Sequence, residues 1–144
     1  MNRINLRWTL LIAVILSPAY ISDLKNGFGQ ENETTRTEGK SNKYIDYLQN
    51  ARNLLNQTSA EYKNSNYTGA EELATAAYLD NFEHVEHEIE EKGSHSFMED
   101  IELIMREKLR DLIKDKANQT ELELHINATD AKLLEAINLM KGTK

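Results

Sequence analysis

The segment from Phe82 to Glu91 carries the densest cluster of side chains in this sequence that could do chemistry. It reads Phe-Glu-His-Val-Glu-His-Glu-Ile-Glu-Glu, which places five carboxylates and two of the four histidines of the chain within ten residues. Carboxylates and neutral imidazoles are ligands that divalent and ferric first-row metals accept. The segment therefore indicates a metal site, although a solvated acidic helix end has the same composition.

Helical spacing separates the inner candidates of this cluster from the outer ones. On an α-helix the positions i, i+3, i+4 and i+7 share one side, and here they are Glu83, Glu86, His87 and Glu90. The apolar stripe is centred near Val85 and Ile89, so Glu86 lies at the flank of the core and His87 lies almost opposite it. We expect Glu86 as an inner metal ligand, Glu83 and Glu90 as supporting ligands, and His87 as an optional nitrogen donor.

A second candidate ligand lies in the next predicted helix, where Glu102 flanks an apolar stripe. Arg106 follows four residues later and Arg110 four residues after that, so both arginines are expected in structural ion pairs. Glu102 is expected either to meet Glu86 across the helix pair, with Arg106 orienting it, or simply to pair with Arg106. The sequence leaves these two arrangements open.

The composition excludes several classes of function. The 144 residues include 24 acidic and 17 basic ones, and the net charge of −7 makes nucleic acid a poor partner. The chain has no cysteine, so disulfides, thiol catalysis and thiolate-held metals are excluded. The sequence has no Gly-rich phosphate loop, no nucleophile elbow and no Glu-x-x-His motif of a redox di-iron site. We therefore expect no catalytic residues and no enzyme.

The N-terminal segment is typical of an exported protein. Arg3 and Arg7 precede an apolar run that ends at Leu16, and the small residues Ser17 and Ala19 follow. We interpret residues 1–19 as a signal peptide or membrane anchor, which predicts an extracytoplasmic protein, either secreted or membrane-associated at the outer face of the cell. Five Asn-x-Thr sequons agree with a glycoprotein, and they lie at Asn32, Asn56, Asn66, Asn118 and Asn127.

The rest of the sequence predicts an all-α fold. We expect an antiparallel four-helix bundle over residues 43–144, preceded by a flexible linker at residues 20–42. Apolar residues recur at three- and four-residue steps over three segments, which are 44–62, 68–91 and 97–116. We interpret the alternating segment 121–126 as a linker or irregular helical turn, because a single short strand has no partner. Thr129 or Asp130 is then expected to cap the last helix.

Two of these segments together resemble a known family. Tyr78, Leu79, Phe82, Glu83 and Glu86 form the pattern Tyr-Leu-x-x-Phe-Glu-x-x-Glu, and the next helix carries Ile101, Glu102, Arg106, Leu109 and Arg110. Both segments are similar to the extracytoplasmic helical region associated with high-affinity iron permeases of the oxidase-dependent iron transporter family, over roughly residues 44–116. The chain lacks the multi-span permease domain and its membrane-embedded Arg-Glu-x-x-Glu motif, so it is not expected to transport iron itself.

The resemblance implies an accessory protein that handles iron for a membrane permease, with Glu83, Glu86 and Glu102 as the positions carried over. We therefore expect a secreted or surface-anchored helical protein for iron uptake that binds iron or another divalent or trivalent cation. The alternative is a non-enzymatic extracytoplasmic module for protein interaction with no metal site, in which the acidic face is a solvated rim.

Overall fold

The computed structural model describes residues 33–142, with side chains from residue 39 onward. All regular secondary structure in this range is helical, so the predicted all-α class is confirmed. The predicted signal peptide or anchor at residues 1–19 and the sequon at Asn32 lie outside the described residues. Between residues 33 and 142, no helix combines the length and the apolar character that crossing a membrane requires.

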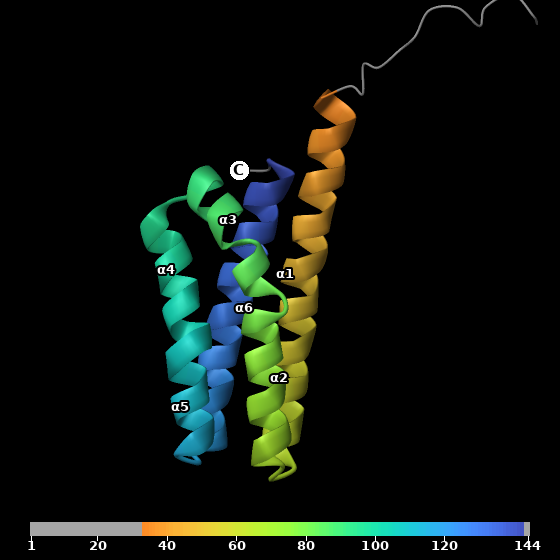
Figure 1. The fold of residues 1–144 in the computed structure, drawn as a ribbon. Helices are drawn as coiled ribbons and strands as arrows, with labels where there is room; N and C mark the ends of the chain where they lie inside the picture. Colours follow the sequence, from red (N-terminus) through yellow and green to blue (C-terminus); the bar gives the residue numbers. More distant parts are fainter. Residues whose placement is uncertain (1–32, 143–144) are drawn as a thin grey trace, which may run out of the picture. The chain divides into compact units, whose positions relative to one another are not determined.

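The helices follow one another with short connections. They are α1 (Glu33–Lys63), α2 (Tyr67–Leu79), the 3₁₀ turn η1 (Phe82–His84), α3 (Glu86–Lys92), α4 (His95–Leu103), the π-helical turn η2 (Ile104–Lys108), α5 (Leu109–Lys114) and α6 (Gln119–Lys141). In Figure 1, α1, α2, α6 and the continuous run from α4 to α5 lie side by side. The α1–α2 and α5–α6 turns lie at one end of these helices, and α3 lies at the other.

Helix α1 begins earlier than the sequence predicts. The flexible linker was expected to continue to residue 42, whereas the helix already begins at Glu33. Two contacts hold this first part: Ser41 Oγ donates to the carbonyl of Met140 at 2.8 Å, and Lys40 Nζ lies 3.4 Å from Glu88 Oε2. Since these partners lie far away in the sequence, tertiary contacts stabilise a polar segment that has little apolar periodicity of its own.

The predicted helix 68–91 is interrupted, which corrects the sequence interpretation. Helix α2 ends at Leu79, and Asn81 leaves the helical conformation with φ −134° and ψ −65°. The Asn81 side chain is 6% exposed, and its Nδ2 donates at 3.0 Å to the carbonyl of Ala76 in the last turn of α2. Asparagine side chains compete with the backbone for such carbonyls, and this competition ends helices. The chain then re-forms helix at Glu86, so Glu83 and Glu86 do not share one continuous helix.

The predicted linker at 121–126 is also wrong, because these residues belong to α6. Asn118 caps this helix by accepting the backbone N–H of Thr120 at 2.8 Å, in place of the expected caps Thr129 and Asp130. A buried stripe runs along the whole helix, through Leu122, Ile126, Thr129, Leu133, Ile137 and Met140. The exposed Leu124, at 67%, produced the misleading alternation.

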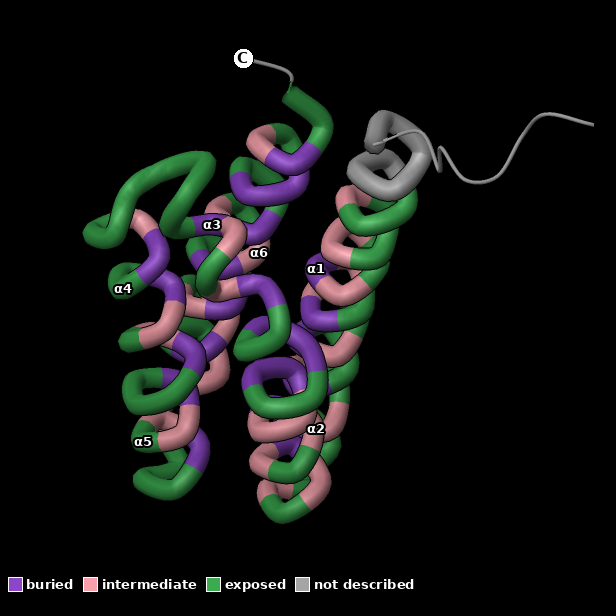
Figure 2. Tube along the Cα trace, turned by 45° about the horizontal axis from the view of Figure 1, so that its top comes forward, coloured by how far each residue is buried: buried purple, intermediate pink, exposed green. Residues whose placement is uncertain are grey.

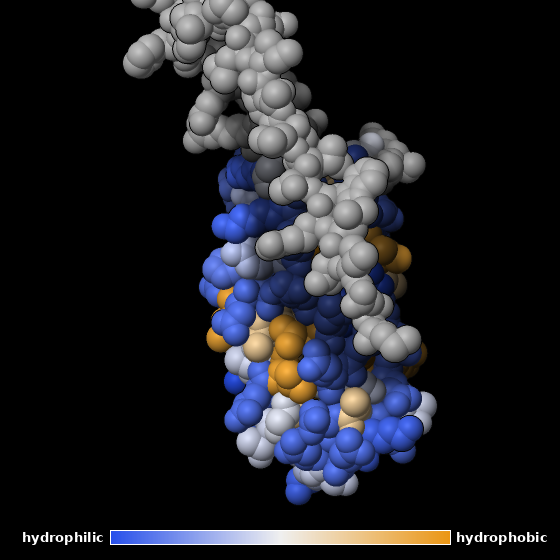
Figure 3. Space-filling model, turned by 90° about the vertical axis from the view of Figure 1, so that its right-hand side faces the viewer, coloured by the Kyte–Doolittle hydropathy of each residue, from blue (hydrophilic) through white to orange (hydrophobic). Residues whose placement is uncertain are grey.

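The buried side chains form one core between the helices. Figure 2 shows the buried parts of α1, α2, α4 and α6 turned toward one another and the exposed parts turned outward. The described surface that is visible in Figure 3 is mostly hydrophilic, with small apolar patches. Helix α2 contributes Ala70, Ala74 and Ala77, whose small side chains allow α1 to approach closely. Phe82 and Val85, which flank the interruption after α2, are fully buried. The interruption is therefore anchored in the core and fixes where α3 begins.

Candidate functional site

Two carboxylates and a phenol from three different helices meet beside this interruption. Tyr78 lies in the last turn of α2, Glu86 begins α3, and Glu102 lies near the end of α4. The hydroxyl of Tyr78 lies 3.5 Å from Glu102 Oε1. The Oε1 atom of Glu86 is buried and has no hydrogen-bond partner among the described residues. The structure therefore brings together the two carboxylates that the sequence proposed as inner ligands.

The environment of Glu86 disfavours its charged form. Burial raises the pKa of the Glu86 carboxyl, and the negative charge of Glu102 raises it further. Hydrogen bonding from the Tyr78 phenol opposes this rise in pKa, as does the more distant positive charge of Arg106. The phenol has a single proton, so it can serve only one of the two carboxylates at a time. The carboxylate that does not accept the phenol proton is therefore available for another positive or hydrogen-bonding partner.

Tyr78 is itself part of the electrostatic balance. Burial and the charges of Glu86 and Glu102 raise the pKa of the Tyr78 phenol to about 12. The phenol is therefore protonated at neutral pH and acts as a hydrogen-bond donor between the carboxylates. A cation that bound its oxygen as phenolate would have to displace this proton, which makes such binding pH-dependent.

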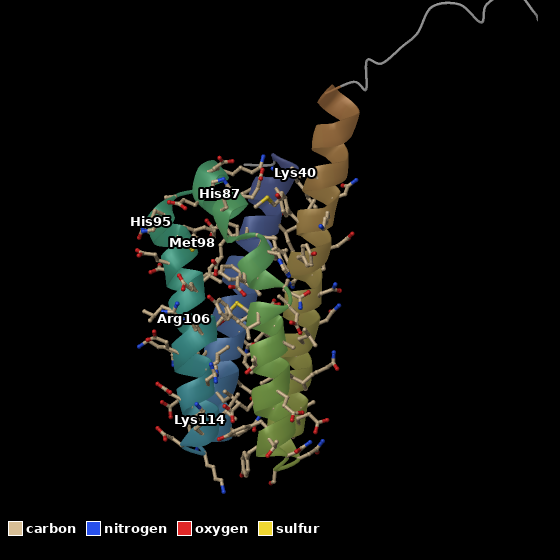
Figure 4. The ribbon with its side chains drawn as sticks, in the orientation of Figure 1. Lys40, His87, His95, Met98, Arg106 and Lys114 are labelled. Atoms are coloured by element: carbon tan, nitrogen blue, oxygen red, sulfur yellow. The ribbon has the colours of Figure 1, made fainter. Side chains whose placement is uncertain are left out.

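Arg106 reaches Glu102 from the π-helical turn η2. Its Nη1 bonds to Glu102 Oε1, and its Nη2 lies 3.2 Å from Glu107 Oε1. Figure 4 places Arg106 part-way along the continuous run from α4 to α5. π-Helical turns inside α-helices are found frequently at functional sites. Glu102, Leu103 and Arg106 also line a pocket of about 300 Å³, which gives solvent access to this side of the cluster.

His87 and Glu90 do not join this cluster. The His87 side chain is 82% exposed, with Nε2 3.3 Å from Glu91 Oε1. Glu90 Oε1 lies 3.0 Å from His95 Nδ1 instead. Figure 4 shows both histidines at the end of the helices that carries α3, away from Arg106. The expected nitrogen donor and one expected supporting ligand are therefore engaged in separate surface pairs.

Glu83 and Arg110 make no hydrogen bond or ion pair with the described side chains of the cluster. Glu83 is exposed on η1, and its negative charge contributes to the raised pKa of Glu86. Arg110 turns toward α2, where its Nη2 lies 3.7 Å from Glu71 Oε1, and Lys114 Nζ lies 3.5 Å from the same oxygen. The Nε atom of Arg110 is buried without a partner among residues 33–142. Arg110 thus pairs between helices, whereas Arg106 pairs along its own helix.

The donor set differs from the one that the sequence predicts. Within the described part of the chain, no group of three or more His, Asp or Glu residues is arranged so that it could hold a metal ion. The structure supplies the third oxygen near Glu86 and Glu102 from Tyr78, which the sequence analysis named in the family pattern but not as a metal ligand. A buried tyrosine hydroxyl usually has a hydrogen-bond partner, so the position of Tyr78 in an apolar stripe could have indicated a polar group beside it.

Comparisons with known proteins identify no relative of this chain. No protein-family model, no curated protein and no solved structure matches the chain. The resemblance of Tyr78, Glu86, Glu102 and Arg106 to the iron-permease-associated region therefore stays a prediction from the sequence.

Proposed function

We propose that the chain is a helical accessory protein that binds a metal cation, iron in particular, at Glu86, Glu102 and Tyr78. The single observation that carries this proposal is the buried, unpartnered Oε1 of Glu86 beside a second carboxylate. Two negative charges close together in a partly buried place are unfavourable without a cation between or beside them. Arg106 supplies one positive charge to Glu102, and Glu86 has no equivalent ion-pair partner among the described side chains.

The chemistry of the three donors favours a hard cation. Two carboxylates and a phenol offer oxygen ligands only, which suit trivalent and small divalent cations better than soft ones. The pocket of about 300 Å³ beside α4 exposes the Glu102 side of the cluster to solvent. Arg106 holds Glu102 from outside the donor set and fixes its orientation, as outer-shell partners of metal ligands do. In this proposal the cation is the cargo of the protein.

The location and fold in this proposal follow the sequence. We place the chain outside the cytoplasm, secreted or anchored through residues 1–19, with its helices as an antiparallel four-helix bundle and a membrane iron permease as the recipient of the cation. The proposal assigns no catalytic role and no nucleic-acid partner. It keeps Glu83 as a supporting charge near Glu86 and drops His87 and Glu90 from the site, because their own pairs hold them elsewhere.

Visible spectroscopy with Fe(III) tests the donor set directly. A phenolate bound to ferric iron gives a charge-transfer absorption in the visible range, so addition of Fe(III) as a weak chelate to the full chain should produce a coloured complex. The change Tyr78→Phe should remove this absorption. Tyr47→Phe is the matched control, because Tyr47 lies in α1 beside His84, and it should leave the absorption unchanged. A band that persists in Tyr78→Phe would contradict the assignment of Tyr78.

A second candidate function is protein interaction through exposed leucines on α2 and α4. Leu79 and Leu103 are 45% and 44% exposed, and each directly follows a residue of the cluster, Tyr78 or Glu102. Apolar side chains that are exposed in the free protein can become the buried centre of a protein interface. Cross-linking through Leu79→Cys and Leu103→Cys to membranes that contain an iron permease tests this function. Leu124→Cys serves as the control, because Leu124 is 67% exposed on α6.

A further inference from the structure

The four sequons within residues 33–142 occupy two different kinds of position. Asn66 and Asn118 lie in turns, before α2 and before α6. Asn56 lies inside α1 and Asn127 inside α6. Asparagine in an Asn-x-Thr sequon is modified at exposed loop positions of a folded surface, where both the amide and the threonine hydroxyl are accessible. The structure therefore separates sequons that the sequence treats as equal.

The two sequons inside helices have a buried threonine. Thr58 and Thr129 are 0% exposed. Each hydroxyl donates to a backbone carbonyl one turn earlier, Thr58 to Leu54 at 2.9 Å and Thr129 to His125 at 2.7 Å. Presenting either threonine to an enzyme would require several turns of a core helix to open, and such openings are rare in a folded protein.

The two sequons in turns have both partners exposed. At the start of α6, Asn118 and Thr120 are exposed, and Asn118 has an extended backbone with φ −61° and ψ 137°. Before α2, Asn66 and Thr68 are exposed as well. Both turns lie at the same end of the helices, the end away from α3 (Figure 1).

The side-chain amide nitrogens of the two asparagines differ in their hydrogen bonds. Asn118 accepts the Thr120 N–H through Oδ1 at 2.8 Å, and its Nδ2 has no partner among the described residues. In Asn66, Oδ1 accepts the Gly69 N–H at 3.2 Å and Nδ2 donates to Glu61 Oε2 at 2.6 Å. Reaction at the nitrogen leaves the helix cap of Asn118 intact, because the cap uses the oxygen.

We propose that Asn118 is the principal N-glycosylation site of this protein and Asn66 a secondary site, while Asn56 and Asn127 are not modified in the folded chain. The co-substrate is an oligosaccharide carried on a lipid diphosphate, and a membrane transferase supplies the catalysis. A bond forms between Asn118 Nδ2 and C1 of the sugar, and the C1–oxygen bond to the diphosphate breaks. The lipid diphosphate leaves, and the amide loses one proton to a base. The cluster of Tyr78, Glu86 and Glu102 takes no part in this modification.

Transfer in vitro onto the folded full chain tests the proposal. The chain and four synthetic peptides, one for each sequon, are incubated with a purified single-subunit oligosaccharyltransferase and its lipid-diphosphate oligosaccharide. Glycopeptide mass spectrometry gives the rate at each site, and each rate is divided by that of the matching peptide. We expect this ratio to be highest at Asn118, intermediate at Asn66, and lower by about tenfold or more at Asn56 and Asn127 than at Asn118.

Two variants of Thr120 complete the experiment. Thr120→Ala destroys the sequon but keeps the Asn118 cap, so it should abolish modification at Asn118 and leave the ratio at Asn66 unchanged. Thr120→Ser keeps the hydroxyl and should retain modification. A ratio at Asn56 or Asn127 that equals or exceeds that of Asn118, or a folded chain that is not modified at Asn118, would overturn the proposal.

Discussion

The hydroxyl of Tyr78 lies 3.5 Å from Oε1 of Glu102, which joins the end of α2 to α4 across 24 residues of sequence. The interruption after α2 explains how a third group arrives at the same place. Asn81 ends the helix and α3 begins afresh at Glu86, whose carboxylate interacts with both Tyr78 and Glu102. Two local irregularities, this interruption and the π-helical turn that carries Arg106, thus flank one polar cluster.

Glu86→Gln should stabilise the metal-free protein at neutral pH. The pKa of Glu86 is raised in the folded state, so at neutral pH its ionised carboxylate destabilises the folded state relative to the unfolded state. After allowance for solvent screening, the expected gain in the free energy of unfolding is about 1 kcal/mol or less. The gain should vanish as the pH falls below the ordinary pKa of glutamate, where Glu86 is protonated in both states.

Thermal unfolding followed by circular dichroism, at about pH 7 and about pH 4, measures this effect. Glu83→Gln is the matched control, because Glu83 is exposed and should change the midpoint much less. A Glu86→Gln variant that is less stable than the wild type at neutral pH would show that the Glu86 carboxylate has a partner that stabilises its charge.

Asn81→Asp should destabilise the protein by about 1 to 2 kcal/mol. Asn81 is 6% exposed, and its Nδ2 donates to the Ala76 carbonyl at 3.0 Å. Aspartate has nearly the same shape but would place a negative oxygen against that carbonyl. Denaturant unfolding checks the prediction, with Asp80→Asn as an exposed neighbouring control. An unchanged free energy of unfolding in Asn81→Asp would mean that the interruption after α2 does not depend on this side chain.

Arg52→Met should destabilise the packing of α1 against α6. Arg52 binds Asp130 with two bonds, Nε to Oδ1 at 2.7 Å and Nη2 to Oδ2 at 2.9 Å, and both side chains are about three-quarters buried. Such two-pronged pairs are stronger than ordinary surface pairs, so a double-mutant cycle with Asp130→Asn should give a coupling of about 1 kcal/mol. The pair of Lys132 with Asp100 is the control, because the Asp100 side chain is 61% exposed, and its coupling should be smaller.

The fold class was predictable because apolar periodicity reports burial. The stripes in α1, α2 and α4 to α5 appear in the sequence at three- and four-residue steps, and Ser94 caps α4 by accepting the Phe97 N–H at 3.1 Å. The errors arise where a single side chain overrides the pattern. The buried Asn81 interrupts a helix although the apolar stripe continues past it. The exposed Leu124 makes the segment look like a strand although Leu122 and Ile126 belong to a buried helical stripe.

The candidate site was predictable only for residues beside the core. Glu86 and Glu102 flank apolar stripes, and the structure places them near one another. His87 and Glu90 were grouped with Glu86 by assuming one unbroken helix from residue 68 to 91. Glu86, His87 and Glu90 do share α3, but the local pairs of His87 with Glu91 and of Glu90 with His95 keep both side chains out of the cluster. Tyr78 was missed because periodicity does not distinguish a phenol that packs from a phenol that also donates a hydrogen bond.

Cation binding should weaken as the pH falls, and it should begin to weaken at a higher pH than for an ordinary carboxylate site. The raised pKa of Glu86 means that protons compete for its oxygens at a pH where an exposed glutamate is still ionised. Titrations of the full chain with Mn(II) at a series of pH values measure the apparent affinity. An affinity that does not change between about pH 7 and about pH 5 would contradict a site built on Glu86.

Titration calorimetry of the full chain with Fe(II) under anaerobic conditions tests cation binding at Glu86 and Glu102. We expect saturable binding at a single site in the wild type and no such binding in Glu86→Gln with Glu102→Gln, at unchanged helicity by circular dichroism. The variant His87→Gln with Glu90→Gln should bind as the wild type does, because these side chains lie outside the cluster. Absence of saturable binding in the wild type, or equal binding in the Glu86→Gln with Glu102→Gln variant, would show that Glu86 and Glu102 do not form a metal site.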